Sequence, residues 1–157
     1  GNLGELAREG GQLHRAELYH AESLQIARDV GDPLWVATSL NDLGLIAIQT
    51  DAFVHSSERL LEALSMSCEV GIMDTQLRSI CWGSVLAYRY GDTAFSERCV
   101  DFIRSHEMST VIYSNLRDVL NIYAIPEDFG EPTHTEDLET ISAEMQTYLQ
   151  QFDTKHA

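Results

Sequence analysis

Apolar residues recur at helical spacing along most of the chain, and glycines separate the segments in which they do so. Residues 12–30 carry one broad apolar stripe, which Gly31 ends. The same spacing predicts helices over 33–49, 52–70, 74–90 and 93–106. Asp32, Asp74 and Asp92 stand where helix N-caps are expected, and Pro33 suits a first helical position. The hydrophobic pattern therefore predicts an all-α chain of consecutive antiparallel helix hairpins.

The pattern loosens after residue 106. A further helix is expected over 111–125, closed by Pro126, because a residue before proline avoids helical angles. Residues 126–135 predict a linker. Thr133 and Glu136 have the spacing of a capping box, and a last amphipathic helix follows them. Its apolar positions are Leu138, Ile141, Met145, Tyr148, Leu149 and Phe152, and we expect this helix to shield the last pair.

The helical pattern repeats. Leu3-Gly4 recurs forty residues later as Leu43-Gly44, and a weaker third copy follows thirty-nine residues on, where Gly83 aligns with Gly44. A period near forty residues filled with helical pattern predicts stacked helix pairs that share a continuous core.

The first copy begins close to its glycine. Three residues precede Gly4, whereas eleven helical residues precede Gly44. Two interpretations remain open: the first helix is cut short and the native protein continues upstream, or the helix is naturally short. The first interpretation predicts apolar surface at this end, and with it a homodimer formed through the exposed repeat end.

Charge and composition narrow the choice of partners. Twenty-five acidic residues against ten Lys and Arg leave a net charge of -15, which disfavours nucleic acid and anionic lipid surfaces as direct partners. No apolar run approaches the roughly twenty residues of a membrane span. Three cysteines without paired spacing fit a reducing compartment, so we expect a cytoplasmic protein.

Residues that carry chemistry lack the spacing that catalysis requires. The six histidines show no two-ligand spacing on one helix face, and no phosphate-loop, dinucleotide, zinc-protease or serine-elbow motif occurs. His20 is expected to pack against a neighbouring helix, while Cys81 and Trp82 are expected in the core. We therefore expect no enzymatic activity, no metal and no cofactor.

The repeated residues resemble the tetratricopeptide-repeat (TPR) family in its longer form of about forty residues, as in bacterial signalling and transcription regulators. The resemblance implies a right-handed superhelix, an α-solenoid of about three repeats over residues 1–106. Residues 107–157 would then form a degenerate fourth hairpin or C-terminal capping helices. It rests on Leu3, Gly4, Ala7, Ala16, Leu43, Gly44, Ala47, Ala63, Trp82, Gly83 and Ala94.

The resemblance also implies that the first helix of each pair lines a concave groove. The residues carried over to that groove are Glu5, Arg8, Glu9, Thr38, Asn41, Leu45, Ile48, Gln49, Leu77, Ile80, Ser84 and Tyr88. Because Arg8 is the one basic residue among them, a neutral to basic or partly apolar peptide fits better than an acidic one. The implied function is a scaffold or adaptor for protein binding. The alternative is a small-molecule inducer-sensing domain of a transcription regulator.

Overall fold

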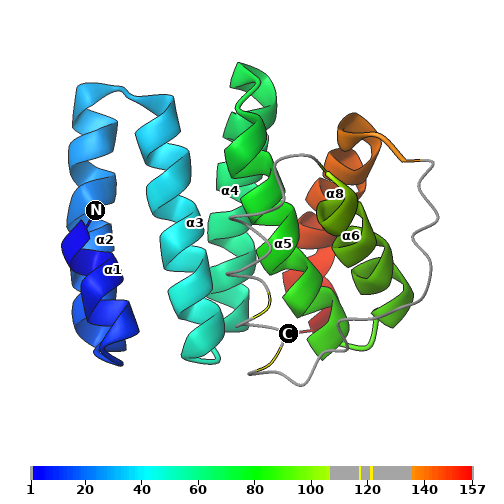
Figure 1. The fold of residues 1–157 in the computed structure, drawn as a ribbon, viewed down its shortest axis with the longest axis horizontal. Coiled ribbons are helices and arrows are strands. Elements are labelled where there is room, and N and C mark those ends of the chain that lie inside the picture. Colours follow the sequence, from blue (N-terminus) through cyan, green and yellow to red (C-terminus); the bar gives the residue numbers. More distant parts are fainter. Residues whose placement is uncertain (1, 107–116, 118–120, 122–135, 157) are drawn as a thin grey trace.

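The computed structural model describes residues 2–106, 117, 121 and 136–156, and these form helices and short turns without a strand. The helices lie side by side, with α1 and α2 at one end of the row and α6 and α8 at the other (Figure 1). The helix expected over 111–125 and the linker over 126–135 lie outside the described residues. The helices are α1 (Asn2–Glu9), α2 (Leu13–Val30), α3 (Pro33–Gln49), α4 (Phe53–Val70), α5 (Met73–Arg89), α6 (Thr93–Ser105) and α8 (Leu138–His156).

Short turns join the successive helices from α1 to α6, and all but the turn between α3 and α4 contain a glycine. Gly31 ends α2 and Gly71 ends α4, both in the left-handed conformation (φ of 75° and 78°) that glycine adopts without strain. Asp32 begins α3, where its carboxylate accepts a hydrogen bond from the Trp35 amide at 3.0 Å. The expected cap at Asp74 is wrong, because Ile72 is the residue that precedes α5 and Asp74 lies within its first turn.

The structure places the third copy at an offset of forty residues, not thirty-nine. The helix bounds of α3 and α5 differ by forty, and so do two matching hydrogen bonds. Ser56 Oγ donates to the Gly44 carbonyl at 2.9 Å, and Ser96 Oγ donates to the Ser84 carbonyl at 2.8 Å. Ser84 therefore takes the place of Gly44, and the alignment of Gly83 with Gly44 is corrected by one residue.

Gly4 and Gly44 permit close contact between the two helices of their own pair. A Cβ on Gly44 would lie 2.7 Å from Leu60 Cδ2, and one on Gly4 would lie 2.4 Å from His20 Nε2. In both pairs the contacting residue stands sixteen positions after the glycine. The first two pairs therefore pack in the same way, with a small residue where the helices cross.

Helix α8 departs from the simple series of pairs, because it packs against α4, α5 and α6 together. Ser142 contacts Gln76 near the start of α5, and the Phe152 ring meets the Tyr90 ring just past its end, at 4.8 Å between centroids. Helix α8 therefore runs parallel to α5. Met145 takes the position beside Gly83, where a Cβ would lie 2.4 Å from its Sδ.

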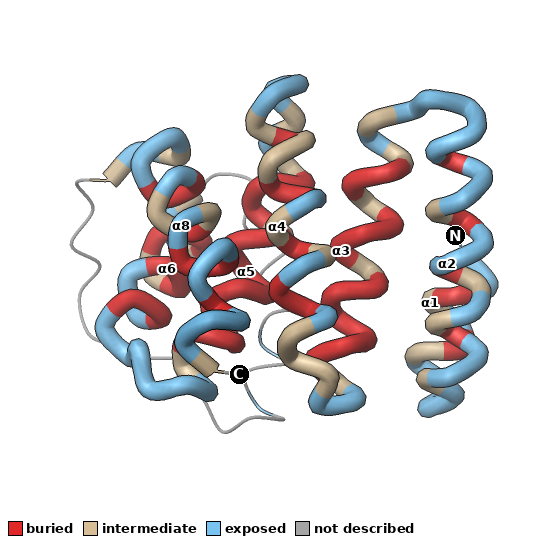
Figure 2. Tube along the Cα trace, turned by 180° about the vertical axis from the view of Figure 1, so that it is seen from behind, coloured by how far each residue is buried: buried red, intermediate tan, exposed pale blue. Residues whose placement is uncertain are grey.

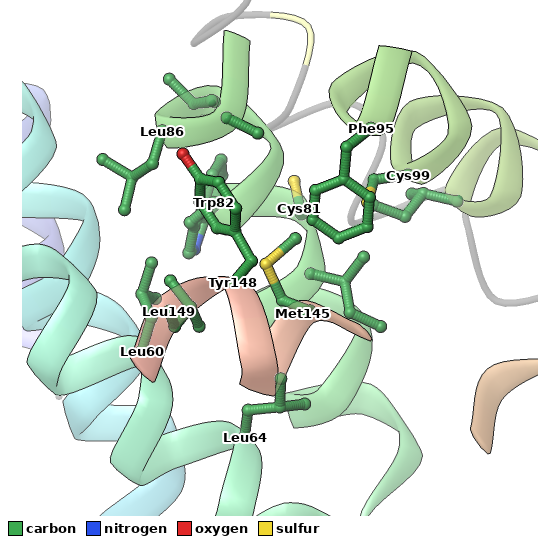
Figure 3. Packing of buried hydrophobic residues seen from close by; sticks show 14 of the residues in the cluster. Leu60, Leu64, Cys81, Trp82, Leu86, Phe95, Cys99, Met145, Tyr148 and Leu149 are labelled. Atoms are coloured by element: carbon green, nitrogen blue, oxygen red, sulfur yellow. The ribbon is translucent and has the colours of Figure 1, made fainter. Parts of the chain in front are cut away.

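The main hydrophobic core joins α8 to the earlier helices. Leu64 of α4, Trp82 of α5 and Leu149 of α8 belong to one buried cluster (Figure 3). Helices α3 and α5 are buried along most of their length (Figure 2). Each large apolar side chain buried in this way stabilises the fold by about 1.5–3 kcal/mol. The expectation that Cys81 and Trp82 lie in the core is confirmed, with exposed fractions of 0% and 3%.

Candidate binding surface

Six of the twelve residues expected to line a groove are buried, and six are at least partly exposed. The buried ones are Asn41, Leu45, Ile48, Leu77, Ile80 and Ser84. Those that reach the surface are Glu5, Arg8, Glu9, Thr38, Gln49 and Tyr88. A partner would meet the second set, which lies on α1, α3 and α5.

The offset of forty changes which α3 residues correspond to three of the buried residues of α5. One residue rotates a position by about 100° around a helix. The alignment on Gly83 equated Leu77, Ile80 and Ser84 with the expected groove residues Thr38, Asn41 and Leu45 of α3. At an offset of forty they correspond instead to Ala37, Leu40 and Gly44. All three of these α3 residues are themselves buried. Position 78 is the true counterpart of Thr38, and the residue there is Arg78.

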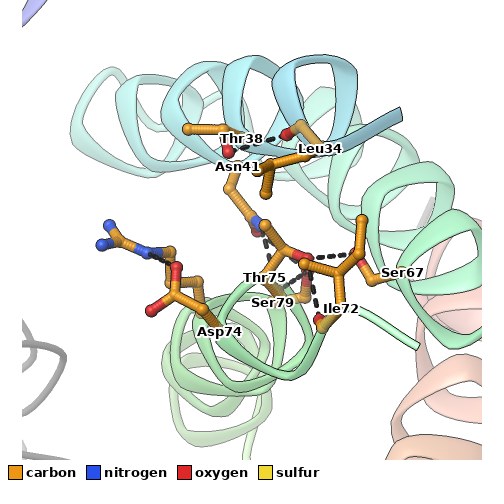
Figure 4. A network of polar contacts seen from close by, with 9 residues as sticks. Leu34, Thr38, Asn41, Ser67, Ile72, Asp74, Thr75 and Ser79 are labelled. Atoms are coloured by element: carbon orange, nitrogen blue, oxygen red, sulfur yellow. Dashed lines mark hydrogen bonds and ion pairs between the residues drawn. The ribbon is translucent and has the colours of Figure 1, made fainter. Parts of the chain in front are cut away.

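Asn41 joins α3 to α5 inside the protein (Figure 4). Its Nδ2 donates to the Thr75 carbonyl at 3.1 Å, and its Oδ1 accepts from Ser79 Oγ at 2.9 Å. The amide nitrogen and the amide oxygen are therefore both hydrogen-bonded, and the side chain is 1% exposed. Buried polar groups are tolerated when they are hydrogen-bonded in this way. Asn41 holds two helices together and is not available to a partner.

Charged side chains gather where α1, α3 and α5 face the same side. Arg8 forms an ion pair with Glu5 one turn earlier, and Arg78 forms another with Asp74, with 2.9 Å between Nε and Oδ2. The hydrogen bond from Arg8 lowers the pKa of Glu5, and the charge of Arg78 acts in the same direction. The same hydrogen bond raises the pKa of Arg8, to which Glu9 and Asp42 also contribute. We call this set the charged face: Glu5, Arg8, Glu9, Asp42, Asp74 and Arg78.

His20 lies directly beneath the charged face. The expectation that it packs against a neighbouring helix is confirmed, because it is 1% exposed and its ring lies against Gly4 of α1. Its Nδ1 stands 3.2 Å from Asp42 Oδ2 of α3. His20 therefore connects the first pair to α3 and places the Asp42 carboxylate at the edge of the face.

Three residues of the charged face, Asp42, Asp74 and Arg78, were missed by sequence reasoning, which expected Asp74 only as a helix cap. Asp42 follows Asn41 directly, and its place on the face depends on the contact with His20. Arg78 could have been found from the forty-residue offset, since it stands forty positions after Thr38. With all three included, the face carries four carboxylates and two guanidinium groups. It is acidic overall, and each arginine already has an acidic neighbour on its own helix.

Apart from the charged face, a recessed surface lies between α6 and α8, with a volume of about 530 Å³. The rings of Phe95 and Tyr148 form its apolar wall, with 5.5 Å between their centroids. Burial raises the pKa of the Tyr148 hydroxyl. Arg98 lies at the rim, where it pairs with Glu136 and Glu144 of the C-terminal segment.

No protein-family model matches the chain, and searches of curated proteins and of solved structures return no match either. Within the described ranges, none of the helices has the length and hydropathy needed to cross a membrane. In the same ranges, no group of three or more His, Cys, Asp and Glu side chains is arranged to hold a metal ion.

Proposed function

We propose that the chain is a TPR-like interaction module, a right-handed solenoid of helix pairs that binds a protein partner on its charged face. The offset of forty residues supports the repeat. It relates the bounds of α3 and α5, and the hydrogen bonds of Ser56 and Ser96. The resemblance to bacterial regulators with long repeats extends the proposal to a scaffold in signalling or transcription.

The chemistry of the face indicates the kind of partner. Four carboxylates against two arginines favour a basic segment, and the net charge of -15 adds a long-range attraction for cations. Tyr88, near the end of α5, is a half-buried aromatic residue. Such rings supply contact area at low conformational cost in interfaces. The partner that fits best is a basic amphipathic peptide or helix with an apolar side.

A charge reversal on the face tests the proposal. The probe is a fluorescent basic amphipathic peptide, compared with an acidic peptide that keeps the same apolar residues. Glu9→Lys is expected to weaken binding of the basic peptide by about fivefold at low salt, because it replaces an attraction with a repulsion. Glu97→Lys on α6 changes the net charge equally and serves as the control, since Glu97 is also exposed. Equal effects of the two substitutions on binding would contradict the proposal.

The recess between α6 and α8 supports a second candidate, an inducer-sensing domain. Its volume of about 530 Å³ falls within the range of small-molecule sites, roughly 300–1,000 Å³. A ligand that binds there in the folded protein raises the melting temperature, and above its Kd the stabilisation grows with the logarithm of the ligand concentration. Thermal shift with a panel of aromatic metabolites, repeated on Thr147→Trp to fill the recess, distinguishes this candidate from peptide binding. Shifts that persist in the filled variant would count against it.

A further inference from the structure

The pair α1–α2 exposes large apolar side chains on the side that faces away from α3 and α4. Leu3 is 63% exposed, Leu6 is 62% exposed and Ile26 is 44% exposed. Leu3 and Ile26 line a shallow hollow of about 240 Å³ together with Tyr19 and Glu22. We call Leu3, Leu6, Glu22 and Ile26 the N-terminal face. Scattered apolar residues are normal at a surface, so the face needs a further reason before a partner is assigned to it.

The forty-residue offset supplies that reason. The counterparts of Leu3, Leu6 and Ile26 are Leu43, Ile46 and Met66, and these are wholly or partly buried. Ile46 of α3 packs against small residues of the first pair, and Met66 of α4 packs into the cluster between α2 and α3. The N-terminal face thus repeats, residue for residue, the apolar surface by which α3–α4 packs onto α1–α2.

The polar position of the face repeats as well. Glu62 is the counterpart of Glu22, and its carboxylate pairs with Arg28 of the preceding helix α2 at 2.6 Å. Glu22 itself is exposed and has no such partner among the described residues. A surface that matched this face would therefore carry a basic residue opposite Glu22.

A second copy of the chain fits this face poorly. A two-fold interface is self-complementary, so pairing through the face would bring two copies of Glu22 into one interface. Each copy also carries a net charge of -15. The corresponding face of α3–α4 does not pack on a copy of itself. It packs on a different surface, which α1–α2 provides. This surface includes the small residues Ala7 and Ala16, and Arg28 lies farther along α2.

We infer that the N-terminal face binds an antiparallel helix pair with small apolar residues at its crossing and a basic residue opposite Glu22. This partner has the chemistry that α1–α2 presents to α3–α4. It is separate from the segment expected at the charged face, so either inference stands if the other fails.

Duplication of the first forty residues tests the inference in the full chain. A copy of residues 1–40 is inserted directly before residue 1. This keeps the forty-residue offset between pairs and places the Arg28 of the added copy opposite Glu22. We expect the melting temperature to rise by about 5 °C or more, because Leu3, Leu6 and Ile26 become buried. An unchanged melting temperature, or circular dichroism showing that the added residues are not helical, would overturn the inference.

A paired substitution separates docking from the effect of a longer chain. Leu6→Glu with Ile26→Glu, made in the original copy, is expected to abolish the rise in the duplicated protein. The same two substitutions should change the melting temperature of the unduplicated chain by about 2 °C or less, since both side chains are exposed there. A rise that survives them would overturn the inference. So would sedimentation that shows the unduplicated chain as a dimer that these substitutions dissociate.

Discussion

Met145 packs so closely on Gly83 that a Cβ on the glycine would lie 2.4 Å from the Met145 Sδ. The contact joins residues sixty-two positions apart and fixes α8 beside α5. Real Cβ atoms do not approach a heavy atom this closely, so any side chain at position 83 displaces the methionine or the helix that carries it.

Gly83→Ala is therefore expected to destabilise the protein by about 1–3 kcal/mol, as overpacking in a filled core does. The helical preference of alanine offsets part of this cost, by roughly 1 kcal/mol. Urea denaturation followed by circular dichroism measures the difference. Gly83→Ala combined with Met145→Ala should lose less stability than the two separate losses added together. Additive losses would show that the two residues are not in contact.

Asn41→Ala is expected to cost about 1–3 kcal/mol, because it removes two buried hydrogen bonds between α3 and α5 and leaves the Ser79 hydroxyl bonded to the Thr75 carbonyl alone. The matched control is Thr38→Ala on the same helix. Among the described residues, the Thr38 hydroxyl bonds only the Leu34 carbonyl one turn earlier, so its loss should cost well under 1 kcal/mol. Chemical denaturation of the two variants gives the comparison. Equal losses would contradict the linking role of Asn41.

Asp51→Gly is expected to stabilise the protein by about 0.5 kcal/mol. Asp51 has a φ of 57°, a left-handed conformation that is strained for residues other than glycine. Its counterparts at offsets of forty are Gly11 and Gly91, with φ of 72° and 87°. The gain is limited by the extra freedom of glycine in the unfolded chain. Thermal denaturation tests it, and a lower melting temperature would show that the Asp51 side chain supports the turn.

Stability is expected to depend on the ionisation of Glu5, whose pKa lies below its ordinary value of 4.5 because of Arg8. A lowered pKa contributes stability at pH values above the unfolded pKa, and this contribution is lost as the pH falls through the folded pKa. Glu5→Gln should therefore cost a few tenths of a kcal/mol at pH 7, given the partial exposure of the pair. The difference should vanish in acid, at a pH well below the folded pKa. Denaturation at both pH values, with Glu9→Gln as the control, measures it.

The three cysteines are expected to differ in reactivity. Cys81 and Cys99 are fully buried, and burial raises the pKa of both thiols. Cys68 is partly exposed, although burial also raises its pKa. Titration of the native protein with a disulfide reagent should modify Cys68 first, and the other two only as the protein unfolds. A fast reaction that persists in Cys68→Ala would contradict this packing.

Local sequence signals predicted the helices because these signals act within a few residues. Gly31 and Gly71 end helices by adopting the left-handed conformation, and Asp32 caps the next helix through its own carboxylate. The repeat was also visible, since Leu3-Gly4 and Leu43-Gly44 match directly. The third copy was misplaced by one residue, because Gly83 is identical in residue type to Gly44 and Ser84 is not.

The sequence by itself therefore determined the helical class, most helix ends and the forty-residue period, all of which depend on neighbouring residues. Only the tertiary structure decided which residues of α5 reach the surface, because one residue of misalignment turns a position by about 100° around a helix. It also decided the place of α8, since the contacts of Met145 with Gly83 and of Ser142 with Gln76 join segments distant in sequence. Such contacts depend on how whole helix surfaces fit together, and this fit leaves no periodic signal in either segment.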